Sequence, residues 1–140
     1  MTAWVTDSQP GIFTQDSSGK GAGSILNQDY SLNSAAHPAK KGSVVMVYLT
    51  GLGVVNPPVA DGVITGSALS HQIETVTATV NGQPADVLYA GTAPGLVAGV
   101  NQVNVRIPTA TPSGNARIAI LVGTGPSPAR SSGNVTVAVE

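Results

Sequence analysis

The 140-residue chain contains no cysteine and little charge. Without cysteine it can form no disulfide, no cysteine-ligated zinc site and no thiol nucleophile. Charged residues make up 9% of the chain and the net charge is −1, whereas an ordinary domain has about a quarter of its residues charged. The chain has too few basic residues to neutralise a phosphate backbone, so we expect no nucleic-acid partner.

Long apolar runs are also missing. No run approaches the ~18 residues that a membrane-spanning helix needs, so the sequence predicts no membrane span. The opening MTAWVTDSQPGIF lacks the basic segment and apolar run of a signal peptide. An extracellular location would therefore mean that the domain belongs to a longer exported chain.

Aromatic residues are scarce, and the five are Trp4, Phe13, Tyr30, Tyr48 and Tyr89. The core must therefore be built from valine, isoleucine, leucine and alanine, a mixture that favours strands. Seventeen glycines and ten prolines interrupt every helical period. These features predict an all-β protein.

Alternating apolar and polar residues mark the expected strands. Val76, Ala78 and Val80 alternate with threonines, and Asn81-Gly82 then supplies the two left-handed residues of a tight hairpin turn, with ADVLYA as the returning strand. Residues 43–53, SVVMVYLTGLG, predict a central strand buried on both faces. Further strands are expected in AWV and PGIFT, an edge strand interrupted at Pro10-Gly11, in residues 24–27, and in NQVNVRIP, RIAILVG and NVTVAV.

These seven to eight strands, with turns every 8–12 residues, predict an immunoglobulin-like antiparallel β-sandwich. A small β-barrel is the alternative. The length favours one domain over residues 1–140, with residues 1–9 as a linker or edge strand.

The stretch YAGTAPGLVAGVNQVNVRIP contains a glycine-rich loop that is either a binding site or an architectural turn. In the architectural interpretation, Gly91, Gly95 and Gly99 carry the chain from one sheet to the other and Pro94 fixes a turn. Gln102 and Asn104 then point away from the core, and Gln102 bonds to the backbone of the loop. The loop lacks the helix start that phosphate binding needs.

Few residues suggest chemistry. His37 and His71 lie in loop-like segments, and Ser127 in GTGPSPA has no nucleophile-elbow context. The acids are scattered as turn formers, and no calcium-loop spacing occurs; they are Asp7, Asp16, Asp29, Asp61, Glu74, Asp86 and Glu140. Lys20, Lys40 and Lys41 lie in polar loops, which does not favour an internal amide crosslink. We expect no catalysis, cofactor or metal.

Several segments in order resemble the uncharacterised C-terminal domain family first described in Solibacter proteins. They are PGIFT, ILNQDYSLNS, HPAKKGSVVMVYLTGLG, NPPVADG, VNGQPADVLYAGTAPGLVAGVNQVNVRIP and GNARIAILVG. The resemblance spans residues 10–139 and implies an extracellular immunoglobulin-like module attached to other domains, with no known activity. Tyr30 stands where the family form NQDGS has a glycine, which argues against a left-handed turn there.

Three functions remain open. The first is a non-enzymatic structural or adhesive module of an exported bacterial protein, with contact surfaces around Pro57-Pro58 and residues 91–99. The second is a carbohydrate-binding module, for which Trp4, Tyr30, Tyr48 and Tyr89 are the available stacking residues. The third is a self-associating fibre subunit, in which an edge strand pairs with a neighbour. The partner is thus another domain of the parent protein, a surface protein or a glycan.

Overall fold

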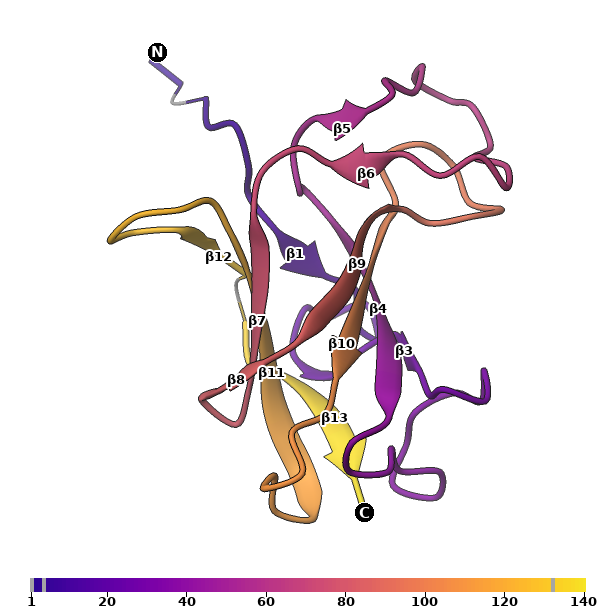
Figure 1. The fold of residues 1–140 in the computed structure, drawn as a ribbon, viewed down its shortest axis with the longest axis vertical. Coiled ribbons are helices and arrows are strands. Elements are labelled where there is room, and N and C mark those ends of the chain that lie inside the picture. The colour runs from indigo at the N-terminus through magenta and orange to yellow at the C-terminus, as the bar shows by residue number, and fades with distance from the viewer. Residues whose placement is uncertain (1, 4, 132) are drawn as a thin grey trace.

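A computed structural model describes residues 2–3, 5–131 and 133–140 (Figure 1). Within these residues the chain forms thirteen strands and no helix. The strands make two sheets that pack face to face without closing into a barrel, which confirms the all-β sandwich and excludes the barrel.

The first sheet has the order β1-β4-β10-β9-β6-β5, and β3 also pairs with β4. Its strands are β1 (Gly11–Ile12), β3 (Ile25–Leu26), β4 (Val44–Thr50), β5 (Val55–Asn56), β6 (His71–Gln72), β9 (Val87–Thr92) and β10 (Asn101–Arg106). The expected central strand is β4, which has neighbours on both edges. Val45, Val47 and Leu49 on its inner face are fully buried. On its outer face Met46 is buried, Tyr48 is half-buried and Thr50 is exposed, so the expected burial of both faces is only partly confirmed.

The second sheet has the order β2-β13-β11-β7-β8, and β12 also pairs with β11. Its strands are β2 (Gly21–Ala22), β7 (Val76–Val80), β8 (Gln83–Ala85), β11 (Gly114–Val122), β12 (Ala129–Arg130) and β13 (Val135–Val139). Asn81 and Gly82 form the turn between β7 and β8, with φ values of 52° and 77°. These values match a type I′ turn, in which both central residues have positive φ.

The hairpin partner of β7 differs from the expected ADVLYA. Only residues 83–85 pair with β7, and the chain leaves the second sheet at Asp86 to form β9 in the first sheet. Pro84 explains the short pairing, because proline has no N–H to donate and marks a strand edge.

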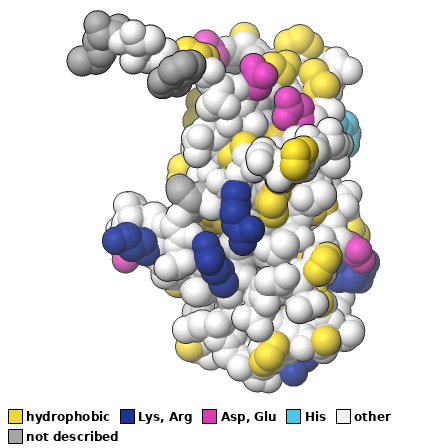
Figure 2. Space-filling model, turned by 90° about the vertical axis from the view of Figure 1, so that its left-hand side faces the viewer, with side chains coloured by type: hydrophobic (Ala, Val, Ile, Leu, Met, Phe, Trp, Pro, Cys, Tyr) yellow, Lys and Arg dark blue, Asp and Glu magenta, His cyan; other side chains and the backbone are white. Residues whose placement is uncertain are grey.

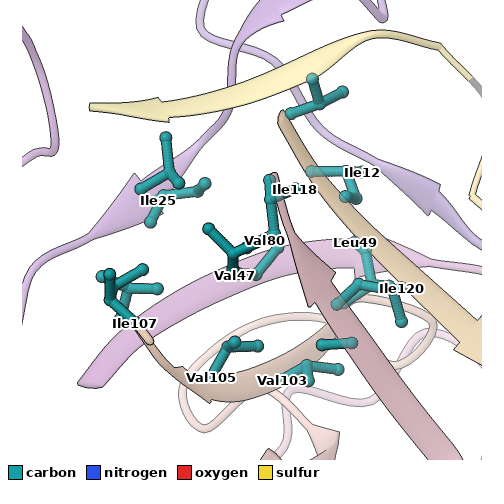
Figure 3. Close-up of a cluster of buried hydrophobic side chains, with 14 of the residues drawn as sticks. Ile12, Ile25, Val47, Leu49, Val80, Val103, Val105, Ile107, Ile118 and Ile120 are labelled. Atoms are coloured by element: carbon teal, nitrogen blue, oxygen red, sulfur yellow. The ribbon is translucent and has the colours of Figure 1, made fainter. Parts of the chain in front are cut away.

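The core lies between the sheets and is made of small aliphatic side chains from both (Figure 3). Val47, Val103 and Val105 of the first sheet face Val80 and Ile118 of the second, and all five are at most 1% exposed. The alternation in β10 therefore buries the apolar residues and leaves Gln102 and Asn104 on the outer face.

The outer edge of β13 is covered by loop residues. The Asn33 side chain donates to the Ala138 carbonyl (2.9 Å) and accepts from its N–H (2.8 Å), as a neighbouring strand would do. Gly21, Gly23 and Ala39 bond to further backbone groups of residues 134–140. This edge therefore offers no free row of groups for another strand.

Two expectations for the N-terminal third were wrong. No strand forms in residues 2–3 or 5–10, where an edge strand was an option, and Trp4 lies outside the described residues. Tyr30 has a left-handed φ of 67° although it is not a glycine. Its side chain is 75% exposed, and its N–H donates to the Asn27 carbonyl at 2.9 Å, which closes the turn.

Candidate binding surface

The glycine-rich loop between β9 and β10 consists of two consecutive turns. In residues 93–96, Pro94 and Gly95 occupy the central positions, and Gly95 has a φ of 81°. In residues 97–100, Gly99 takes the third position with a φ of 101°. Backbone hydrogen bonds of 3.2 and 3.1 Å close the turns. Proline second and glycine third are the residues that a type II turn requires.

The loop does not cross between the sheets, contrary to the sequence-based expectation. β9 and β10 are neighbours in the first sheet, so the loop closes a hairpin. The crossing takes place at Asp86, between β8 and β9. Glycine in such a loop indicates positive φ, but it does not say which sheet the next strand joins.

Gly91 lies within β9 and has a different role from the loop glycines. A Cβ atom at Gly91 would lie 2.1 Å from the Ser70 carbonyl oxygen and 2.9 Å from the Tyr89 hydroxyl. The absence of a side chain lets the segment before β6 cross closely over β9. The Tyr89 hydroxyl reaches past Gly91 to donate to the Thr92 carbonyl (2.6 Å).

Gln102 does not bond to the loop, which corrects its expected role. Its Nε2 donates to Asn104 Oδ1 at 2.9 Å, on the outer face of β10. Alternate residues of a strand share a face, so the two amides meet each other and not the loop at the strand end.

The residue that ties the loop is Thr65, which is 5% exposed. Its hydroxyl donates toward the carbonyl oxygens of Ala93 (2.5 Å) and Leu96 (2.9 Å). Its N–H donates to the Leu96 carbonyl, and its carbonyl accepts from the Gly95 N–H. Thr65 was missed by the sequence reasoning because VITGSALS has no strand alternation and a threonine there is an ordinary loop residue.

Residues 51–73 and 93–100 thus form one end of the sandwich, the loop end (Figure 1). It brings together the two segments expected to make contacts, around Pro57-Pro58 and residues 91–99. A cleft of about 300 Å³ lies between them, with Pro58, Asp61 and Gly99 among its lining residues.

The loop end exposes an unusual number of large apolar side chains. Seven of them are between 39% and 67% exposed: Val54, Val63, Ile64, Leu69, Ile73, Leu96 and Val97. Single exposed apolar residues are ordinary, whereas several at one end of a protein indicate a contact site.

Basic charge is absent from the loop end. The sequence has no lysine or arginine between Gly42 and Val105, and Asp61 is the one formal charge in the loop end. Figure 2 shows yellow and magenta side chains over the upper part of one face and dark blue ones lower down. A partner of the loop end is therefore not recognised through anionic groups.

The residues considered for catalysis are scattered over the surface, except that Asp29 and His37 line a common groove. His37 and His71 are both exposed, and His71 packs edge-on against Tyr89 with 5.4 Å between ring centroids. All seven acids are exposed. Within the described residues no three histidine or acidic side chains are close enough to hold a metal ion. Lys20, Lys40 and Lys41 are exposed as well, so the structure does not bury an amine for an amide crosslink.

Two of the acids form side-chain turns. Asp16 accepts from the Ser18 N–H (3.0 Å), and Asp29 accepts from both the hydroxyl (2.6 Å) and the N–H (3.0 Å) of Ser31. Hydrogen bonds from these serines lower the pKa of both carboxyl groups, because they favour the charged form. These acids therefore act as turn formers.

Comparisons with known proteins give no relative for this chain. No family model, no curated protein and no solved structure matches it. Across the described residues, no helix has the length and hydrophobicity of a membrane span.

Proposed function

We propose that this chain is a non-enzymatic structural or adhesive module of an exported bacterial protein, and that its loop end packs against the preceding domain. The single observation that carries the proposal is the set of seven exposed apolar side chains at the loop end. A surface that contacts only water gains no stability from a group of exposed apolar side chains.

The position of the N-terminal segment favours a preceding domain as the partner. The Gln9 N–H donates to the Gly51 carbonyl at 2.8 Å, and the Asp7 carbonyl lies 2.7 Å from the position of a Cβ on Gly53. The segment therefore leaves the fold at the loop end, while the C-terminus lies at the opposite end (Figure 1). A domain joined to this segment would lie beside the apolar side chains.

Export and bacterial origin rest on the resemblance to the Solibacter-type C-terminal domain family. The low charge and the lack of cysteine agree with it. The absence of catalysis is part of the proposal. It is supported by the exposure of both histidines and all seven acids, since catalytic groups are usually tuned by burial.

The test is binding of the 140-residue chain to the remainder of its full-length gene product, expressed separately. We expect measurable affinity by calorimetry, and a loss of at least about tenfold in the double variant Ile64→Ser, Val97→Ser, which removes two central apolar contacts. The matched control is Leu88→Ser, since Leu88 is 52% exposed on β9 outside the loop end. No binding, or equal binding of all variants, would overturn the proposal.

A further inference from the structure

A second surface lies on the outer face of the first sheet, where aromatic and amide side chains form a row across three strands. Phe13 directly follows β1, and its N–H donates to the Tyr48 carbonyl in β4 (3.1 Å). Tyr48 is in register with Gln102 in β10. Ile12 and Leu49 point into the core, so Phe13, Tyr48 and Gln102 share the outer face.

A groove of about 530 Å³ runs along the aromatic part of this row. Its lining includes the rings of Phe13 and Tyr48 and the hydroxyl-bearing residues Thr14, Ser17 and Ser24. Phe13 is 40% exposed and Tyr48 half-buried, so both rings are held by the sheet and still reach solvent. A volume in this range suits a small ligand.

The amide pair continues the row beyond Tyr48. The bond from Gln102 Nε2 to Asn104 Oδ1 fixes both side chains and leaves the Gln102 carbonyl oxygen and the Asn104 amide nitrogen free to bond outward. The Gln102 oxygen can accept a hydrogen bond from one hydroxyl group of a ligand, and the Asn104 nitrogen can donate to a neighbouring hydroxyl group. Because strands are about 4.8 Å apart, Phe13, Tyr48 and Gln102 span about 10 Å, which is enough for two sugar rings.

Among the residues that the structure describes, no charged side chain lines the groove. Aromatic faces attract the C–H surfaces of a pyranose, and hydroxyl and amide groups bond to its oxygens. An anionic ligand would find no counter-ion in the groove, and a purely apolar ligand would leave the amides unpaired.

We propose that the outer face of the first sheet binds a neutral saccharide, which stacks on Phe13 and Tyr48 and hydrogen-bonds to Gln102 and Asn104. Leu96 and Val100 of the loop end also line this groove, so the site adjoins the loop-end contact. It goes beyond the proposed function because its ligand is a saccharide and not a protein domain. Phe13 directly follows β1, Tyr48 lies in β4, and Gln102 and Asn104 lie in β10. These segments are distant in the sequence, so the surface exists only in the folded sheet.

The experiment is calorimetric titration of the 140-residue chain with cellotetraose, xylotetraose, laminaritetraose and chitotetraose, and with a mannuronate tetramer as the acidic counterpart. We expect binding of at least one neutral sugar, and at least a tenfold loss of affinity in Phe13→Ala and in Tyr48→Ala. Tyr48→Phe keeps the ring and should keep the affinity. Leu88→Ala, a change outside the groove, should not alter it.

An NMR titration of the unmodified protein keeps the test decisive if an alanine variant fails to fold. The side-chain amide signals of Gln102 and Asn104 should shift with the same sugar, while those of Asn115 should not. No binding to any neutral sugar, unchanged amide signals, or full binding in folded alanine variants would overturn the proposal. Binding of the acidic tetramer alone would also overturn it.

Discussion

The two ends of the sandwich are held together by different kinds of buried polar side chain. At the loop end, the Thr65 hydroxyl joins two loops of the same sheet. At the opposite end, the Asn33 amide joins a loop beside the first sheet to β13 of the second. Thr65 bonds to residues 28 and 31 positions away, whereas the Asn33 bond spans 105 positions.

The ends also differ in what they present to solvent. The loop end is apolar and has Asp61 as its one formal charge. The opposite end has Lys40 and Lys41 beside Asp29 and His37, around a groove of about 670 Å³. One scaffold therefore separates an end rich in exposed apolar side chains from an end that carries charged groups of both signs.

The largest effect is expected for Asn33→Leu at the opposite end. The change removes the partners of the Ala138 N–H and the Asn27 Oδ1 in buried surroundings, while the Ala138 carbonyl keeps its bond from the Ala39 N–H. Each such group costs ~1–3 kcal/mol, so we expect a loss of about 3 kcal/mol or more in the free energy of unfolding. Chemical denaturation measures it, with exposed Asn115→Leu as the control. A loss below about 1 kcal/mol would show that Asn33 does not hold this end.

Thr65→Val should destabilise the loop end by about 2 kcal/mol. Valine keeps the shape of threonine but cannot donate to the Ala93 and Leu96 carbonyl oxygens. Hydrogen exchange should show faster opening of residues 93–100, with β13 unchanged. The control is the exposed Thr109→Val. Equal exchange in wild type and variant would contradict the role of the hydroxyl.

Gly82→Val should cost about 1 kcal/mol or more, because a β-branched residue is strained at a φ of 77°. No atom lies within 4 Å of a Cβ there, so crowding does not contribute. Gly66→Val at the loop end is the matched control, since Gly66 has the same open surroundings without a positive φ. Similar melting temperatures for the two variants would contradict the strain.

Gln102→Ala should have the smallest effect, below ~0.5 kcal/mol, as for other surface substitutions. Its hydrogen bond goes to another partly buried side chain, so no backbone group of the loop loses a partner. A cost above about 1 kcal/mol in a denaturant melt would mean that Gln102 supports the loop end.

Local patterns predicted most of the scaffold. The alternation in residues 76–80 and 103–107 gave the buried faces, because a strand with one face on the core needs this period. Asn81-Gly82 predicted its turn because left-handed backbone is hard to reach for other residues. The sequence did not predict to which sheet each strand belongs, and the change of sheet at Asp86 was missed.

The side chains that matter for the surfaces were not predictable from local sequence. Thr65 and Asn33 act through partners far along the chain, and neither position has a distinctive pattern around it. Phe13 next to Tyr48 depends on strand pairing between distant segments. Gln102 was assigned to the wrong partner, since its neighbour on the strand competes with the loop.

The Asn33–Ala138 link has a consequence for folding kinetics. A contact between residues 105 positions apart requires the closure of a long loop, so we expect it to form after the transition state. Asn33→Leu should then speed unfolding and leave the folding rate nearly unchanged. The β7–β8 turn closes early at little entropic cost, so Gly82→Val should mainly slow folding. In that case Asn33 would determine how slowly the native state unfolds, and Gly82 would determine how fast it folds.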